Sequence, residues 1–470
     1  MTLRFITSLM AALALTSSLA QAQSLQEIYE LALENDAELK AYEAQFKADQ
    51  EQEILARSAL LPQVSASYDY TETETSTVAD SLVGLDATSG AGIIREIESF
   101  SDTTSKGYTV SLNQALFDLP AWFSFQASKS LTAQAEATFV SQQQALIVRV
   151  AQAYFGVLRA QDNLAASKAQ ERALERQLEQ TQQRFEVGLI ALTDVHEAQA
   201  AFDLAQVARI IDENNLAVAL EGLSVLTAVE HERLYTLGEA FPIAPPSPAD
   251  RSAWVDFALE NNLQLKASRL GETVAQQNAK SKRLEHAPTV TGSFSTSDFD
   301  TDGTSRQESV FNVPPRSERE QDIIRLRLQM PLFAGGAISA NRRRAAEQFN
   351  AARESRIALQ RNTIAQTRSL HMTVMSDVSR VQARAQAIVS SQSALDATQA
   401  GYEVGTRNVV DVLNAQNALY AAKRDYANSR YDYVINQLRL KQQAGLLSPK
   451  DILDLDRYLD APGAVTQSAQ

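Results

Sequence analysis

The chain contains two copies of one sequence pattern, and this duplication limits the folds that it can adopt. The segment LALENDAELKA at residues 31–41 returns as FALENNLQLKA at residues 257–267. Farther along, FEVGLIALTDVHEAQAA at 185–201 returns as YEVGTRNVVDVLNAQNA at 402–418, with Glu, Val, Gly, Asp, Val, Ala, Gln and Ala kept in place. Such self-similarity indicates a repeated structural unit. We therefore expect a tandem duplication whose halves share one order of helices and strands.

Prolines mark the predicted boundary between the two halves. The segment FPIAPPSPAD at 241–250 holds four prolines, which remove backbone donors and force an extended path. We expect the first repeat at 23–245, the second at 246–460, and a flexible tail at 461–470.

Each half also contains a long segment without proline. None occurs between Pro120 and Pro242 or between Pro331 and Pro449, and both segments are rich in strong helix formers. A helix from about Ala121 to Glu186 would have roughly 65 residues and a length of about 100 Å. Such a rod is too long for an ordinary globular core.

Glycines and apolar spacing describe how these rods are arranged. Gly188 and Gly405 each follow a Glu-Val pair, and glycine tolerates the positive φ with which helices often end. We expect each long helix to reverse there and return antiparallel to a partner. Apolar residues at helical spacing predict a seam against neighbouring helices. In the first rod they are Leu146, Val150, Ala153, Val157 and Leu164.

Four shorter segments alternate apolar and polar residues, which is typical of a β-strand with one apolar face. A soluble protein would turn that face to its core, whereas a membrane barrel would turn it to lipid. The stretches Glu72–Ser105 and Ser297–Arg319 are rich in Ser, Thr, Asp and Gly, so we expect surface loops there. The predicted strands lie at about 63–72, 106–118, 289–297 and 320–333.

The first residues have the pattern of a cleaved secretory signal peptide at 1–22. Arg4 precedes the mostly apolar segment Phe5–Leu19, and Ala20-Gln21-Ala22 supplies a small-x-small cleavage site. We expect the exported chain to begin near Gln23. No later segment is apolar enough to span a bilayer as a helix, so export favours a membrane barrel for the strands. Because four strands cannot close a barrel and lipid does not tolerate open edges, several subunits are needed.

Composition excludes several other classes of protein. The chain has no cysteine, which rules out disulfides, thiolate metal sites and lipid attached to a cysteine. A net charge of −14 argues against nucleic acid as a partner. We find no dinucleotide or phosphate-binding loop and no metalloprotease spacing, and therefore expect no enzyme, cofactor or metal site. The basic run Arg342, Arg343 and Arg344 is interpreted as a solvated helix face in preference to an anion site. The scattered histidines are His196, His231, His286 and His371.

The chain resembles the outer-membrane efflux protein (TolC) family over nearly its whole exported length. The resemblance rests on NQALFD at 113–118, QMPLFAGG at 329–336, RFEVGLIALTDV at 184–195 and YEVGTRNVVDVLNAQNALYAAK at 402–423. It implies a mainly α fold with membrane β: a homotrimer with a 12-stranded β-barrel, four strands per subunit, continuous with a long periplasmic α-helical barrel. It also implies an outer-membrane location and a passive exit duct for efflux or type I secretion. The implied partners are a periplasmic adaptor protein and an inner-membrane efflux or ABC-type pump.

The resemblance also implies roles for residues at the two helix reversals. The gate residues fall on Thr193 and Asp194 in the first copy and on Tyr402 and Arg407 in the second. A carboxylate can accept hydrogen bonds from both a phenol and a guanidinium, so these groups could hold the periplasmic end shut.

Two further sets of residues follow from the same resemblance. Asp411 matches an acidic position that forms a ring inside the entrance of some members, which would favour cations. Asn414 stands where a second acid is often found, so strong cation selectivity is in doubt. The adaptor-docking tips fall on Gly188 with Leu189 and on Gly405 with Thr406.

Two other classes of protein remain open at this point. A periplasmic coiled-coil adaptor or structural protein would explain the rods and the export, but not the strand pairs. A general porin would have many strands and few helices. The sequence does not reveal the cargo or the resting state of the duct.

Overall fold

The computed structural model of the protein describes residues 22–307 and 316–460. The predicted signal peptide, apart from its last residue, and the predicted tail at 461–470 lie outside the described residues. The chain divides into two compact units, and each draws on both repeats. We call them the helical unit (Met1–Lys47, Gln134–Arg269 and Glu354–Gln470) and the sheet unit (Ala48–Ala133 and Leu270–Arg353).

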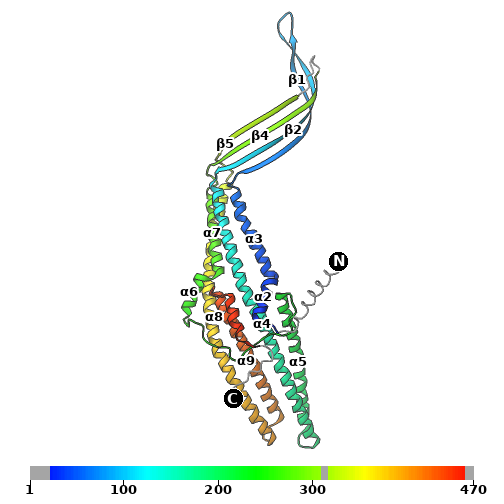
Figure 1. Cartoon of the computed structure of the whole chain (residues 1–470), viewed down its shortest axis with the longest axis vertical. Helices are drawn as coiled ribbons and strands as arrows, with labels where there is room; N and C mark the ends of the chain where they lie inside the picture. The colour runs from blue at the N-terminus through cyan, green and yellow to red at the C-terminus, as the bar shows by residue number, and fades with distance from the viewer. Residues whose placement is uncertain (1–21, 308–315, 461–470) are drawn as a thin grey trace, which may run out of the picture. The chain divides into compact units, whose positions relative to one another are not determined.

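Four antiparallel strands form the core of the sheet unit, in the order β1-β2-β4-β5 (Figure 1). Each repeat contributes one hairpin, and the two hairpins pair through β2 and β4. β1 and β5 therefore form the two edges of this sheet, and neither edge has a partner strand within the described residues. The strands are β1 Gln63–Leu85, β2 Gly92–Phe117, β4 Thr289–Gln307 and β5 Arg316–Gln329.

These strands are much longer than the sequence predicted, and the two predicted surface loops are wrong over most of their length. Glu72–Ser105 continues β1 and β2 as a ladder that turns only at about 86–91. Most of Ser297–Arg319 likewise belongs to β4 and β5. Directly beyond the predicted strands, residues 72–77 and 101–105 are polar on both faces, so the alternation of apolar and polar residues ended where the strands did not. Their many threonines are β-branched and favour extended backbone, which the composition did not make obvious.

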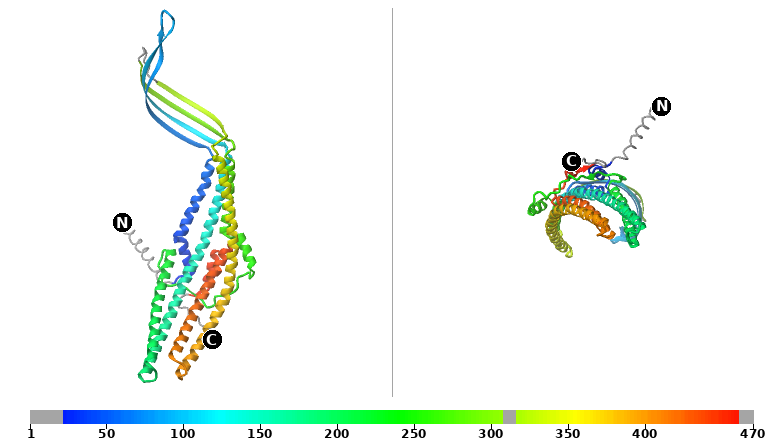
Figure 2. Two further views of the ribbon diagram at one scale, coloured as in Figure 1. Left: turned by 180° about the vertical axis from the view of Figure 1, so that it is seen from behind. Right: turned by 90° about the horizontal axis from the view of Figure 1, so that it is seen from below.

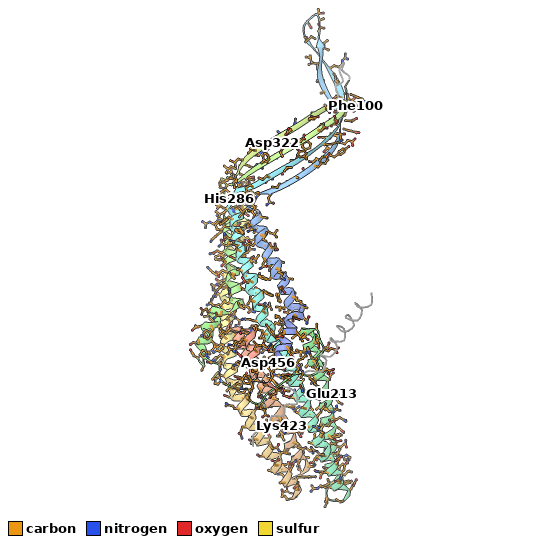
Figure 3. The ribbon with its side chains drawn as sticks, viewed as in Figure 1. Phe100, Glu213, His286, Asp322, Lys423 and Asp456 are labelled. Atoms are coloured by element: carbon orange, nitrogen blue, oxygen red, sulfur yellow. The ribbon has the colours of Figure 1, made fainter. Side chains whose placement is uncertain are left out.

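The predicted alternation of apolar and polar residues is confirmed by the register, in the part of each strand that adjoins the helices. Val64 pairs with Leu112, Leu112 with Phe294, and Phe294 with Ile324, so the four side chains form one row across the sheet. Val64, Phe294 and Ile324 are all exposed, with no cover among the described residues. Asp322, labelled in Figure 3, precedes Ile324 by two residues on the same face of β5, where the apolar band gives way to charge.

Two pairs of long helices form most of the helical unit. They are α4 Leu119–Glu186 with α5 Leu192–Thr227, and α8 Ala337–Glu403 with α9 Val409–Gln443. α4 has 68 residues and α8 has 67, which confirms the predicted rods. Figure 2 shows the lower parts of these helices side by side in one curved layer. None of the helices in the described residues is sufficiently long and apolar to cross a membrane.

The shorter helices show the same duplication in the folded structure. Asp36 ends α2 (Leu25–Asn35), and its carboxylate accepts the N–H of Leu39 in α3 (Ala37–Ser58) at 2.6 Å. Asn262, one repeat later, ends α6 (Arg251–Asn261), and its amide oxygen accepts the N–H of Leu265 in α7 (Leu263–Arg283) at 2.9 Å. Both residues are buried. The tandem repeat is therefore confirmed, while the exact boundary at 245/246 stays a prediction.

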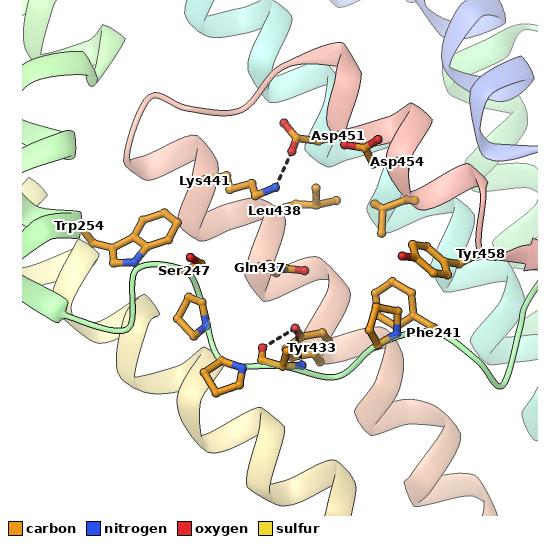
Figure 4. Close-up of a pocket in the computed structure, with 15 residues that line it drawn as sticks. Phe241, Ser247, Trp254, Tyr433, Gln437, Leu438, Lys441, Asp451, Asp454 and Tyr458 are labelled. Carbon is orange, nitrogen blue, oxygen red and sulfur yellow. Dashed lines mark hydrogen bonds and ion pairs between the residues drawn. The ribbon is translucent and has the colours of Figure 1, made fainter.

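The proline-rich segment lies against α9 and the short helix α10 (Pro449–Asp456). The hydroxyl of Tyr433 donates to the carbonyl of Ala244 at 2.7 Å, and the indole N–H of Trp254 donates to the carbonyl of Pro248 at 2.8 Å. Figure 4 shows these side chains around a small pocket of about 330 Å³, closed on one side by the ion pair of Lys441 with Asp451. Two short strands, β3 (Thr236–Leu237) and β6 (Leu459–Asp460), pair nearby.

Candidate functional site

The two helix reversals lie at the same end of the helical unit (Figure 2) and have matching geometry. Gly188 and Gly405 have φ of 76° and 78°, in the left-handed region. In each turn a backbone N–H reaches back five residues, from Leu189 to the carbonyl of Arg184 at 2.9 Å and from Thr406 to that of Gly401 at 2.8 Å. This pattern satisfies carbonyls that the helix end would leave unpaired. A Cβ at either position would meet open space, so crowding does not explain the glycines. They are required by the left-handed backbone conformation.

Both turns present apolar side chains to solvent. Val187 is 70% exposed, Leu189 71% and Val404 75%. Large apolar residues gathered on a surface often mark a place where another protein binds. Leu189 was predicted as part of a docking tip, whereas Val187 and Val404 were missed. Their signal was present in the sequence, since each is the valine of the repeated Glu-Val-Gly.

Tyr402 lies near the end of α8 and connects the two helix pairs. Its ring packs against a buried apolar cluster that includes Leu174 of α4 and Val409 of α9. The guanidinium of Arg184 lies over the ring, 4.7 Å from its centroid. The hydroxyl is buried and has no hydrogen-bond partner among the described residues. A groove of about 630 Å³ runs beside Tyr402, and glutamines of α4 and α8 line much of it.

Arg407 and Asp411 contact one another at the start of α9. Nη1 of Arg407 lies 3.8 Å from Oδ2 of Asp411, and the guanidinium is largely exposed. Asp411 also belongs to a capping box: its N–H donates to the side chain of Asn408 at 2.8 Å, and its carboxylate accepts the N–H of Asn408 at 3.4 Å. Its first role in the chain is therefore to cap the helix. Asn414, one turn on, is exposed.

Thr193 and Asp194 occupy the first turn of α5. The N–H of Asp194 donates to the carbonyl of Ala191 at 3.1 Å, and Ala191 offers no side-chain cap. A carboxylate at this position is favoured by the helix dipole. Within the described chain Asp194 forms no bond with Tyr402 or Arg407, so the predicted link between the copies is not made here. The gate roles of these four residues stay predictions.

The buried histidines of the helical unit have structural partners. His231 places Nε2 2.6 Å from the hydroxyl of Thr227 and Nδ1 against the side-chain oxygen of Gln23. Burial lowers the pKa of His231. Nε2 of His371 lies 3.1 Å from the carbonyl of Ala249. Over residues 22–307 and 316–460, no three or more His, Asp or Glu side chains gather as a metal site.

Comparison with known proteins gives one consistent result. The family model described as outer membrane efflux protein matches residues 28–229 and 254–446. Outer membrane protein TolC of Vibrio cholerae serotype O1 is 35% identical over 452 residues, covering 96% of this chain and 97% of that protein. The alkaline protease secretion protein AprF of Pseudomonas aeruginosa is 31% identical over 435 residues, covering 92% and 86%.

A solved structure confirms the architecture. The crystal structure of the Campylobacter jejuni CmeC outer membrane channel matches with a TM-score of 0.71 at 16% identity, covering 95% of this chain and 94% of that one. The match spans both repeats, and the turns with Gly188 and Gly405 lie inside the two segments that the family model covers. The chain therefore belongs to the outer membrane efflux protein family.

Proposed function

We propose that three copies of this chain form a passive duct in the outer membrane through which efflux or type I secretion substrates leave the cell. The observation that carries this proposal is the sheet with two open edges and an exposed apolar face. Backbone groups on an open edge cannot be left unpaired in lipid. Three subunits with four strands each would pair every β1 with a β5 and close a 12-stranded barrel.

The long helices supply the other part of the duct. A helix of 68 residues extends about 100 Å, which suits a helical barrel that reaches into the periplasm. The relatives are named as an outer membrane protein and a secretion protein, and the matching solved structure is an outer membrane channel. We therefore expect conduction without catalysis.

Other proteins would choose and deliver the cargo. The relatives include a protein named for secretion of alkaline protease. A wide duct recognises little, so selection would rest with an inner-membrane efflux or ABC-type pump and a periplasmic adaptor. The exposed tips with Val187, Leu189 and Val404 are suited to receive that adaptor, since they combine apolar side chains with rigid turns. Gly188, Gly405 and Thr406 hold these turns in shape.

The same end of the helical unit would open and close the duct. We expect Thr193 and Asp194 to accept hydrogen bonds from Tyr402 and Arg407 when the helix pairs shift. Two features support this role: the buried hydroxyl of Tyr402 has no partner within the described chain, and the contact of Arg407 with Asp411 is long. An unpaired buried hydroxyl is unfavourable, so an arrangement that satisfies it gains stability. Asp411 and Asn414 would then line the constriction.

Complementation with assembly analysis tests this function. The gene should restore resistance to dyes and bile salts, or export of a type I substrate, in a cell that lacks its own outer-membrane duct and provides the matching pump and adaptor. The purified protein should come from the outer membrane and have the mass of a trimer by native mass spectrometry. A stable folded monomer in detergent, or recovery from the periplasm, would point instead to a coiled-coil adaptor.

A further inference from the structure

The first turns of α8 are strongly basic in a chain whose net charge is −14. Arg342, Arg343 and Arg344 are all exposed, and none of them forms an ion pair within the described part of the chain. Exposed Ala346 follows on the same stretch of helix. This surface, which we call the basic face, belongs to the sheet unit. The family's transport function gives no reason for three adjacent arginines there.

The last turns of α3, also in the sheet unit, carry the opposite charge. Glu51 is exposed and Glu53 is half-buried, and neither has an ion-pair partner among the described residues. Beside them Ile54 is 50% exposed and Leu55 60% exposed. Glu51, Ile54 and Leu55 lie within about 100° of one another around the helix, so they form one uncovered face, and Glu53 lies at its flank. We call these four residues the acidic face.

The topology places the two faces at opposite edges of the sheet. α3 leads into edge strand β1, and α8 follows edge strand β5. In Figure 1 the upper turns of α3 and α8 lie on opposite sides of α4. Arg343 is six residues from the start of α8 and Glu51 is seven from the end of α3, so each lies about 10 Å along its helix from the helix end that leads to the sheet. The faces therefore lie at similar depths below the sheet.

We infer that the basic face of one subunit packs against the acidic face of the next subunit in the trimer. This inference rests on the proposed function, because pairing β5 with the β1 of a second copy brings α8 beside the neighbour's α3. Arg342, Arg343 and Ala346, which lie within about 100° of one another around α8, then face Glu51, Ile54 and Leu55 of the neighbour's α3. Arg344 and Glu53 flank this contact. The occupant of each face is a second copy of this chain, chosen by charge complementarity and by continuity with the open sheet edges.

The charges set which surfaces meet and in what register. Exposed ion pairs add little affinity, but complementary charge speeds encounter and rejects wrong partners. The arginine run thus guides the β5 edge of one subunit toward the β1 edge of another subunit, which has the acidic face of α3 beside it. Two β5 edges would instead bring like charges together, and these would repel. Assembly should accordingly slow as salt concentration rises.

Cross-linking tests the contact directly, and the chain offers a clean background because it has no cysteine. Glu51→Cys combined with Arg343→Cys should give covalent dimers and trimers with a short bis-maleimide, which tolerates a wider separation than a disulfide. The matched control is Glu51→Cys with Arg361→Cys. Arg361 lies on the same face of α8 but five turns farther along, about 27 Å away, so this pair should stay monomeric on a denaturing gel.

Charge reversal supplies the second measurement. Replacing Arg342, Arg343 and Arg344 with Glu, or Glu51 and Glu53 with Arg, should each reduce trimer yield about tenfold, because like charges would then face one another across the interface. Combining both sets should restore assembly. Trimers that form normally in each reversal variant, with no cross-link from the Glu51→Cys/Arg343→Cys pair, would contradict this interface and leave the duct intact. A wild-type chain that never forms trimers would instead overturn the proposed function.

Discussion

The guanidinium of Arg184 lies over the ring of Tyr402, 4.7 Å from the ring centroid, and so joins the end of α4 to the end of α8. Arg184 belongs to the first repeat and Tyr402 to the second. Their contact therefore links the first helix pair to the second, close to both turns. Any movement that opens the tips must change this contact. It is therefore a natural place to measure how firmly the helix pairs are held together.

Arg184→Gln should loosen the tips without unfolding them. A cation over an aromatic ring at a partly exposed site contributes about 0.5–1 kcal/mol, equivalent to a rise in local opening of roughly two- to fivefold. Hydrogen exchange of the amides at 404–408 measures that rise. The matched control is Arg176→Gln on the same helix, since among the described residues Arg176 bonds only the carbonyl of Arg172, through Nε at 3.2 Å. Equal exchange in both variants would show that the contact does not hold the tips.

Alanine at either turn glycine should destabilise the helix ends. A residue with a Cβ pays about 1–2 kcal/mol in the left-handed region, so Gly188→Ala and Gly405→Ala should each increase exchange or proteolysis at the turn. Gly156→Ala provides the control, because Gly156 lies inside α4 with nothing within 4 Å of a new Cβ. There the substitution should stabilise the helix by about 0.5–1 kcal/mol. A stabilised Gly188→Ala variant would be inconsistent with the observed turn.

A buried hydrogen bond joins α4 to α9 farther from the tips. The hydroxyl of Tyr431 donates to Asp162 Oδ2 at 2.6 Å, and burial raises the pKa of both groups. Tyr431→Phe would leave a half-buried carboxylate without its donor, at a cost of about 1–3 kcal/mol. Thermal denaturation followed by circular dichroism should show the loss. Tyr426→Phe on the same helix should cost much less, because no hydrogen bond from its hydroxyl is found among the described residues.

Much of this architecture could be predicted from the sequence, and the failures have physical causes. The long helices were predicted because strong helix formers without proline act on the local backbone. Their reversals were predicted because the Glu-Val-Gly pattern is also a local signal. The ends of β1 and β2 were missed because Thr and Ser suit both loops and strands, and only the cross-strand register decides between them. The contact of Arg184 with Tyr402 was also missed, since it depends on which faces of two distant helices meet.

The capping role of Asp411 illustrates a partial success. The residue was singled out through family resemblance as an acid at the entrance, while its bond to the N–H of Asn408 follows from local sequence alone. Asn408 and Asp411 have the three-residue spacing of a capping box. The predicted gate residues Thr193, Asp194, Tyr402 and Arg407 depend on how subunits meet, which the local sequence does not encode.

The buried His231 should make the helical unit sensitive to mild acid. Its lowered pKa means that the folded chain keeps the ring neutral, whereas the unfolded chain takes up a proton below its ordinary value of about 6.5. The contribution of His231 to the free energy of unfolding is therefore complete above about pH 6.5 and is lost as the pH falls below that value. His231→Gln should flatten this part of the dependence of the melting temperature on pH. An unchanged slope between pH 7 and 5 would exclude His231 as its source.

Single-channel conductance of the purified trimer in planar bilayers tests the duct and its closure at the tips most directly. Wild-type protein should give small step currents, and Tyr402→Phe with Arg407→Glu should raise their size, because two bonds of about 1–3 kcal/mol per subunit would be lost. The matched control is Tyr420→Phe with Lys423→Glu, which makes the same chemical changes farther along α9, where Figure 3 labels Lys423. Its conductance should equal that of the wild type. An absence of step currents from assembled wild-type trimers would contradict the duct, and unchanged conductance in the assembled double variant would place the gate elsewhere, with Asp411 the next candidate.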